Sequence, residues 1–149
     1  MHRFFAILLV AGPASAMQVD VPRPELCFTS TRVVLADVTS TETTWSTDAD
    51  GGLETTVWFA AQKEFRGTGG DTIELLLPGG VKDGVEHWVE HSPRFIEDAR
   101  YLLFLAPHAE RGLQLLGGEQ GAILISDKPG APGEALSAAI RSLGDCYAP

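Results

Sequence analysis

The chain has 149 residues and a formal net charge of −9, with 20 Asp and Glu against 11 Lys and Arg. This acidic balance argues against nucleic acid and against an anionic membrane surface as partners, because both are bound through clustered Lys and Arg. The length allows one domain with its own core but hardly a second one.

The N-terminus has the three parts of a secretory signal peptide. Arg3 gives a basic start, residues 4–11 form an apolar run, and Ala14, Ser15 and Ala16 offer a small-residue cleavage site. The apolar run is too short to span a bilayer. We therefore expect a signal peptide at 1–16 and an exported protein, periplasmic or extracellular, that is not membrane-spanning.

The chain has two cysteines, Cys27 and Cys146. In an oxidising compartment such a pair is expected to form one disulfide, here joining the two ends of the mature chain. Closing so long a loop stabilises the fold by about 4 to 5 kcal/mol in the chain-entropy account. A metal site is the weaker alternative, because the two cysteines lack C-x-x-C spacing.

A Pro-rich stretch opens the mature chain, and we expect an extended lead-in over 17–30. After it, short runs rich in β-branched and aromatic residues alternate with Gly and Pro clusters, which is typical of a β-sandwich or barrel. No repeat or linker divides this part, so a single domain is expected over 31–149. The expected strands cover residues 31–44, 54–65, 71–77, 84–91, 100–106, 112–116 and 121–126.

One helix is predicted at the end of the chain, over 133–143. Leu136, Ile140 and Leu143 fall at i, i+4 and i+7, and Gly144 is placed to end the helix. Its apolar stripe must cover a face or the open end of the β-domain.

The segment "EHWVEH" at 86–91 matches the H-x-x-E-H signature of inverted zinc peptidases, with His87, Glu90 and His91. On a helix both imidazoles share one face, whereas on a strand four residues span about 13 Å, too far for one zinc ion. Gly84, Pro93 and the β-rich composition favour a strand. We expect no metal there, and both histidines on the face of Val85 and Val89.

No nucleophile or phosphate-binding motif is present, and we expect no cofactor and no catalysis. Asp48, Asp50 and Glu54 surround two glycines and are weak candidates for Ca²⁺ ligands. The alternative is a solvated hairpin turn in which Gly51 or Gly52 takes a positive φ.

Two tryptophans fall on the polar side of their strands. Trp58 alternates against Val57 and Phe59, and Trp88 lies between Glu86 and Glu90. They are candidate binding residues, because aromatic side chains on polar faces can form a partner surface. The alternative is that the C-terminal helix lies over them.

The order of "VVLADV", "KEFRG", "LPGG", "SPRF", "YLLFL" and "GGEQGAILI" resembles a group of small exported bacterial proteins. More distantly, "VVLADV" and the order of "FRG" and "YLLFL" resemble the netrin-like module, the OB-type barrel of tissue inhibitors of metalloproteinases. This resemblance implies a mostly β fold, an OB-like closed or partly open barrel with a C-terminal helix. The inhibitory chemistry is not implied, because it needs a cysteine at the mature N-terminus and Cys27 follows a lead-in.

These patterns predict an exported, non-catalytic module that binds a protein or peptide through the outer face or loops of the barrel. The alternative is a metal-dependent hydrolase that uses residues 87–91, and a third possibility is a purely structural envelope component. Neither the ligand nor the oligomeric state follows from the sequence.

Overall fold

The computed structural model describes residues 20–48, 51–128 and 133–147, so the predicted signal peptide at 1–16 lies outside the described residues. Within them the protein is mostly β, as expected. Its helical elements are α1 (Arg23–Thr29), α2 (Glu134–Arg141) and the short 3-10 helices η1 (Gly118–Gly121) and η2 (Gly144–Cys146). Its strands are β1 (Arg32–Trp45), β2 (Leu53–Arg66), β3 (Thr72–Lys82), β4 (Val85–Trp88), β5 (Arg100–His108), β6 (Gly112–Leu115) and β7 (Ala122–Ser126).

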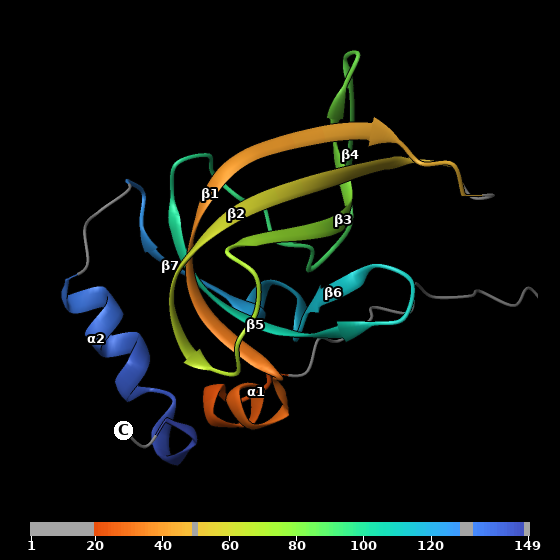
Figure 1. The fold of residues 1–149 in the computed structure, drawn as a ribbon. Coiled ribbons are helices and arrows are strands. Elements are labelled where there is room, and N and C mark those ends of the chain that lie inside the picture. The colour runs from red at the N-terminus through yellow and green to blue at the C-terminus, as the bar shows by residue number, and fades with distance from the viewer. Residues whose placement is uncertain (1–19, 49–50, 129–132, 148–149) are drawn as a thin grey trace, which may run out of the picture.

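The strands form one antiparallel sheet in the order β4-β3-β2-β1-β5-β6, with β7 also paired to β5. Because β6 pairs with residues 105–108 and β7 with residues 100–103, the two short strands follow each other along one edge of β5. Three register shifts between β1 and β2 mark irregularities of the bulge type, which increase strand twist. The sheet curls into a partly open barrel with a helix near its C-terminus (Figure 1), and the expected fold class is confirmed.

The inside of the barrel holds the larger apolar core. Alternate residues of each long strand point inward, and β1 and β5 carry apolar side chains at these positions with almost no exposure to solvent. The inner core residues are Val34, Ala36, Val38, Val57, Phe59, Ile73, Leu75, Ala99, Tyr101, Leu103 and Leu105.

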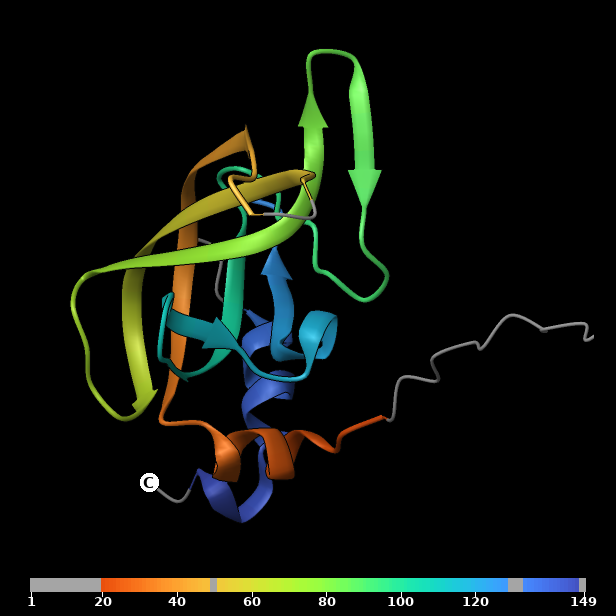
Figure 2. The ribbon, with the colours of Figure 1, turned by 90° about the vertical axis from the view of Figure 1, so that its right-hand side faces the viewer.

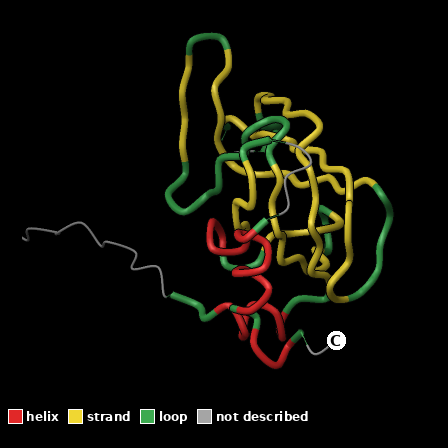
Figure 3. Tube along the Cα trace, turned by 90° about the vertical axis from the view of Figure 1, so that its left-hand side faces the viewer, coloured by secondary structure: helices red, strands yellow, loops and turns green. Residues whose placement is uncertain are grey.

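The outer face of β1 and β5 is also buried, under the helices. Figure 3 shows the helices on one side of the sheet. Val33 and Leu35 of β1 and Leu102 and Phe104 of β5 pack there with residues of α1 and α2. Strands that are buried on both faces are apolar throughout, which explains the unbroken runs in β1 and β5. Leu143, just after α2, is fully buried in this outer core.

The expected extended lead-in at 17–30 is wrong over residues 23–29, which form helix α1. Pro22 caps its start and Pro24 lies in its first turn, where a proline costs nothing because the N–H groups there have no helical acceptor. Leu26 and Cys27 face the outer core and are buried. The burial of this face under the barrel overrides the extended preference of the prolines.

The gap between the expected strands at 71–77 and 84–91 also proves shorter than predicted. Strand β3 passes through Gly79 and Gly80 to Lys82, and a two-residue turn at Asp83 and Gly84, both with positive φ, leads into β4. The resulting hairpin projects from the barrel (Figure 2).

A disulfide joins Cys27 to Cys146, with 6.0 Å between their Cα atoms. It ties α1 to η2 on the covered side of the sheet, and so the expected pairing is confirmed. Two ion pairs support the strands near this core. Arg32, only 5% exposed, bonds Glu64, and Arg100 holds both carboxylate oxygens of Asp37 at 2.6 and 2.8 Å.

Candidate functional site

The barrel is open between β3 and β6. These strands approach each other but do not pair. Each strand on the path from β3 through β2, β1 and β5 to β6 is antiparallel to the next, so β3 and β6 run in the same direction (Figure 2). We call the space between residues 74–77 of β3 and residues 113–115 of β6 the seam.

Strand β3 presents unpaired backbone groups to the seam. Ala61 donates its N–H to the carbonyl of Asp71 at 2.7 Å. In an antiparallel pair, successive residues direct their backbone groups alternately toward the partner strand and away from it. Asp71 directs its carbonyl toward β2, and so every second residue after it also faces β2. Glu74 and Leu76 fall between these residues and direct their N–H and C=O groups away from β2. No hydrogen bond to these groups is found among the described residues.

Strand β6 also directs backbone groups into the seam, from the side opposite β3. Leu116 donates its N–H to the carbonyl of Phe104 at 2.9 Å, so the residue before it, Leu115, directs its backbone groups away from β5. Among the described residues, no hydrogen bond to the backbone groups of Leu115 is found either, so two strand edges with unpaired groups border the seam. Such edges are templates for an added strand.

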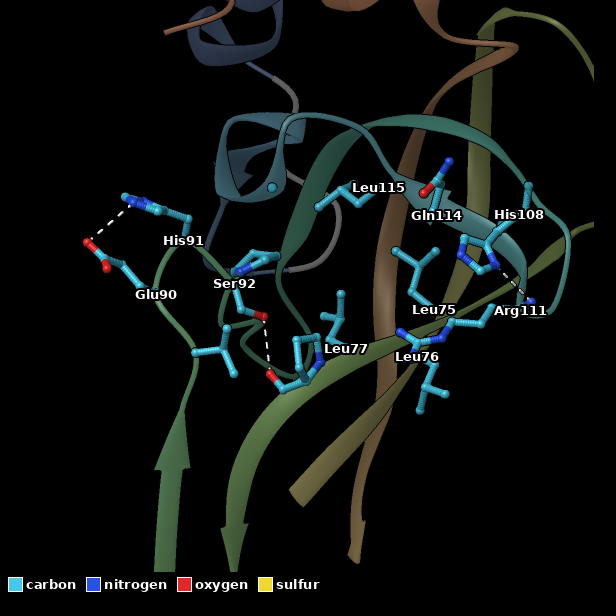
Figure 4. Close-up of a pocket in the computed structure, with 15 residues that line it drawn as sticks. Leu75, Leu76, Leu77, Glu90, His91, Ser92, His108, Arg111, Gln114 and Leu115 are labelled. Carbon is cyan, nitrogen blue, oxygen red and sulfur yellow. Dashed lines mark hydrogen bonds and ion pairs between the residues drawn. The ribbon is translucent and has the colours of Figure 1, made fainter. Parts of the chain in front are cut away.

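A cavity of about 270 Å³ lies in the seam (Figure 4). Leu75 and Leu77 of β3 and Leu113 and Leu115 of β6 form its apolar part, and all four also belong to the inner core or pack against it. Pockets for drug-sized ligands measure about 300 to 1,000 Å³. The cavity is thus suited to a few apolar side chains rather than to a large cofactor.

The loop at 89–93 closes one end of the cavity and contacts Pro78 of β3 and Glu119 of η1. Ser92 donates its hydroxyl to the carbonyl of Pro78 at 3.2 Å, and the carbonyl of His91 accepts the N–H of Glu119 at 3.0 Å. The His91 ring lies between two carboxylates, with Nε2 3.4 Å from Glu90 and Nδ1 3.5 Å from Glu119. This end is acidic.

The other end of the cavity carries hydrogen-bond donors from the turn between β5 and β6. His108, Arg111 and Gln114 line it. The guanidinium of Arg111 lies 3.9 Å from the carboxylate of Glu54 at the start of β2, beyond hydrogen-bond distance. The cavity therefore has an apolar middle, an acidic end and a donor-rich end, as Figure 4 shows.

A second cavity, of about 200 Å³, lies beside Trp88. The hydroxyls of Thr43 and Thr55 line it and bond each other at 2.9 Å. Trp88 is 37% exposed, its indole N–H bonds Glu86, and the guanidinium of Arg94 stacks 3.8 Å from the centre of one of its rings. One face of this tryptophan is thus already occupied.

The two tryptophans do not form a common surface. Trp58 lies on the side of β2 opposite the inner core residues Val57 and Phe59, and its indole N–H bonds Glu74 at 3.1 Å. Trp88 instead lines the second cavity together with Val57. The alternative in which the C-terminal helix covers both tryptophans is wrong, because α2 packs on β1, β5 and β7.

The H-x-x-E-H segment is a strand only over its first part. His87 lies in β4, against Gly52 of the β1–β2 connection, whereas His91 follows the strand with a φ of 63°. The expected strand at 84–91 is therefore wrong beyond Trp88, and His91 does not share the face of Val85. Within the described part of the chain, no three His, Cys, Asp or Glu residues are grouped as a metal site.

The candidate Ca²⁺ ligands are only partly described, because Asp50 lies outside the described residues. Asp48 is exposed, and its carbonyl accepts the N–H of Gly51, which has a φ of 55°. The expected positive φ at this turn is confirmed. Glu54 lies on β2 and faces Arg111.

The seam was not among the sites predicted from the sequence, although the sequence carries one signal for it. Leu75, Leu76 and Leu77 are consecutive, and only alternate residues of a strand can face the inner core. The middle leucine therefore indicated an apolar contact on the other side of β3. Leu76 does line the cavity, and it is half-buried.

None of the helices in the described ranges is long and apolar enough to cross a membrane. Comparisons of the chain with protein-family models, with curated proteins and with solved structures found no match.

Proposed function

We propose that this chain is an exported, non-catalytic module that binds an extended segment of a protein or peptide in the seam. One observation carries the proposal: in the part of the chain that the structure describes, the apolar cavity is bordered by backbone groups on two strands that have no hydrogen-bond partner. A peptide in extended conformation has N–H and C=O groups to pair with such edges, and its side chains alternate to enter the cavity. A purely apolar ligand would leave the backbone groups unpaired.

The distribution of polar groups supports binding rather than catalysis. They occupy the two ends of the cavity, and its middle is formed by leucines. This arrangement holds an apolar side chain between two polar contacts. Ser92, the hydroxyl-bearing residue of the cavity lining, donates to the carbonyl of Pro78 rather than to an imidazole. The proposal includes no cofactor and no metal.

The disulfide between Cys27 and Cys146 supports export, because such bonds persist in oxidising compartments. Mass spectrometry of periplasmic or secreted material tests this part, and we expect a mature chain that starts at Met17. A cytosolic protein that retains Met1 would contradict it.

The binding proposal is tested by NMR of the leucine methyl groups during titration with a pool of random octapeptides. We expect shifts of the Leu113 and Leu115 methyls. Two variants should abolish binding, which is followed in both through the Leu115 methyls: Leu113→Phe, which fills the cavity, and Leu76→Asp, which places a charge at its rim. The control is Leu124→Phe, at an exposed position of β7 outside the cavity, and it should bind as the unchanged protein does. Shifts confined to the methyls of Leu136 on α2 or of Leu124 on β7 would refute the site.

A further inference from the structure

The donor-rich end of the seam cavity has features that point to a more specific ligand. His108 accepts the backbone N–H groups of Glu110 and Arg111 at its Nδ1 atom, each at 3.2 Å. A neutral imidazole that accepts at Nδ1 carries its proton on Nε2. His108 therefore keeps one ring donor for another partner.

Arg111 also keeps donors for another partner. Among the described residues, its guanidinium has one acidic neighbour, Glu54, at 3.9 Å, and the side chain of Arg111 is 37% exposed. A guanidinium carries five N–H donors in a planar fork that matches a carboxylate. The contact with Glu54 is too long to satisfy them, but it orients the side chain beside the cavity.

The apolar part of the cavity begins directly beside these donors. Leu113 follows Arg111 by two residues, and both line the same cavity, together with Leu75 and Leu76 (Figure 4). A ligand that fills it must therefore carry an apolar group and an anionic group close together. The last residue of a peptide has this chemistry, because its side chain and its carboxylate share one Cα atom.

We propose that the seam binds the free C-terminus of a peptide whose last residue is aliphatic. The side chain enters the cavity between Leu75 and Leu113, and the carboxylate accepts hydrogen bonds from Arg111 and His108. This inference rests on the proposed function, since it names which part of a peptide the seam holds. A fatty acid shares the apolar group and the carboxylate but has no backbone amides to pair with Leu76 and Leu115.

The acidic end of the cavity fits a peptide bound with its C-terminus at Arg111. Glu90 and Glu119 lie there around His91 and make that end acidic. A peptide whose C-terminus lies at Arg111 extends its upstream residues along the seam, and basic side chains among them would meet these carboxylates. An opposite orientation would bring the terminal carboxylate beside Glu90.

The test compares two pools of acetylated hexapeptides that end in Leu, one with a free terminal carboxylate and one with a terminal amide, and decanoate as a third probe. Binding is followed through the Leu113 and Leu115 methyl signals. We expect the acid pool to bind at least ten-fold more tightly than the amide pool. Arg111→Gln should lower the affinity for the acid pool to the affinity for the amide pool. It should leave the affinity for the amide pool unchanged. Arg111→Lys should restore only part of the difference, because an ammonium lacks the planar fork.

The matched control is Arg94→Gln, which removes an arginine outside this cavity and should preserve the preference for the acid. Equal binding of acid and amide at these methyls would overturn the inference and leave the proposed function standing. Decanoate that binds as tightly as the acid pool would overturn the assignment of a peptide. The absence of any shift at either methyl with both pools would overturn the inference together with the proposed function.

Discussion

The guanidinium of Arg111 lies 3.9 Å from the carboxylate of Glu54 and links the turn between β5 and β6 to the start of β2. Arg111 lines the donor-rich end of the seam cavity. Its contact with Glu54 is too long for a hydrogen bond and both side chains are partly exposed, so it orients Arg111 more than it stabilises the fold.

Arg111→Gln should therefore lower the free energy of unfolding by less than about 1 kcal/mol, because partly exposed ion pairs contribute little. Urea denaturation of the variant and of the unchanged protein measures the difference. Glu54→Gln is the matched control and should have a similarly small effect. A loss of several kcal/mol in either variant would show that the pair is a structural support and would disqualify Arg111→Gln as a probe of binding.

Removal of the disulfide should lower the free energy of unfolding far more than either of these substitutions. The bond closes a loop with a sequence separation of 119, and for such a loop the chain-entropy account gives about 4 to 5 kcal/mol. Denaturant unfolding of the Cys27→Ala, Cys146→Ala double variant measures this loss, and the unchanged protein under reducing conditions should lose a similar amount. Full stability in both cases would mean that the outer core alone holds α1 and η2 in place.

Leu143→Ala should lower the free energy of unfolding by about 2 to 5 kcal/mol, the usual range for a fully buried leucine. Quenching of tryptophan fluorescence by acrylamide should not change in the folded variant, because α2 and Leu143 pack on β1, β5 and β7 rather than on Trp58 or Trp88. An increase in quenching before unfolding would restore the interpretation that the helix covers the tryptophans.

Tyr101 makes stability depend on pH in the alkaline range. Its side chain is buried in the inner core, and this burial raises the pKa of its hydroxyl above the ordinary value of 10.0, against an opposing hydrogen bond from Ile96. A raised pKa means that the folded state holds the proton more tightly than the unfolded state. The stabilisation is complete below pH 10 and is lost as the pH rises through the folded-state pKa.

Tyr101→Phe should remove this part of the pH dependence. We expect the unfolding midpoint in urea to fall more steeply between pH 9 and pH 11 in the unchanged protein than in the variant. Tyr147→Phe, outside the inner core, is the matched control and should behave as the unchanged protein does. Identical slopes for the unchanged protein and Tyr101→Phe would contradict the assignment.

The strands could be predicted from the sequence because their signals are local. In β1 and β5, dense β-branched and aliphatic runs between turn residues indicate strands whatever covers them. The pairing of Cys27 with Cys146 followed from number and compartment. The helix at α1 could not be predicted from the prolines around it, because its stability comes from Leu26 and Cys27 packing on a sheet that lies later in the chain.

The three consecutive leucines of β3 indicated an apolar contact, but the free backbone edges of the seam could not be predicted because they depend on register. Leu76 and Leu115 present free backbone groups only because of where β3 pairs with β2 and where β6 pairs with β5. A shift by one residue in either pairing would turn these backbone groups toward the neighbouring strand, β2 or β5, and away from the seam. The end of β4 at Trp88 is likewise set by tertiary contacts, since the carbonyl of His91 is held by Glu119, far along the chain.

Hydrogen exchange at single amides tests the central claim most directly. In the free protein, the amides of Leu76 and Leu115 should exchange fast, and the amide of Leu75, which faces β2, should exchange slowly. With a saturating peptide that ends in a free carboxylate, the amide of Leu76, of Leu115 or of both should become protected, while Leu75 stays unchanged. Bound peptide that leaves both Leu76 and Leu115 at their free rates would contradict binding along the seam.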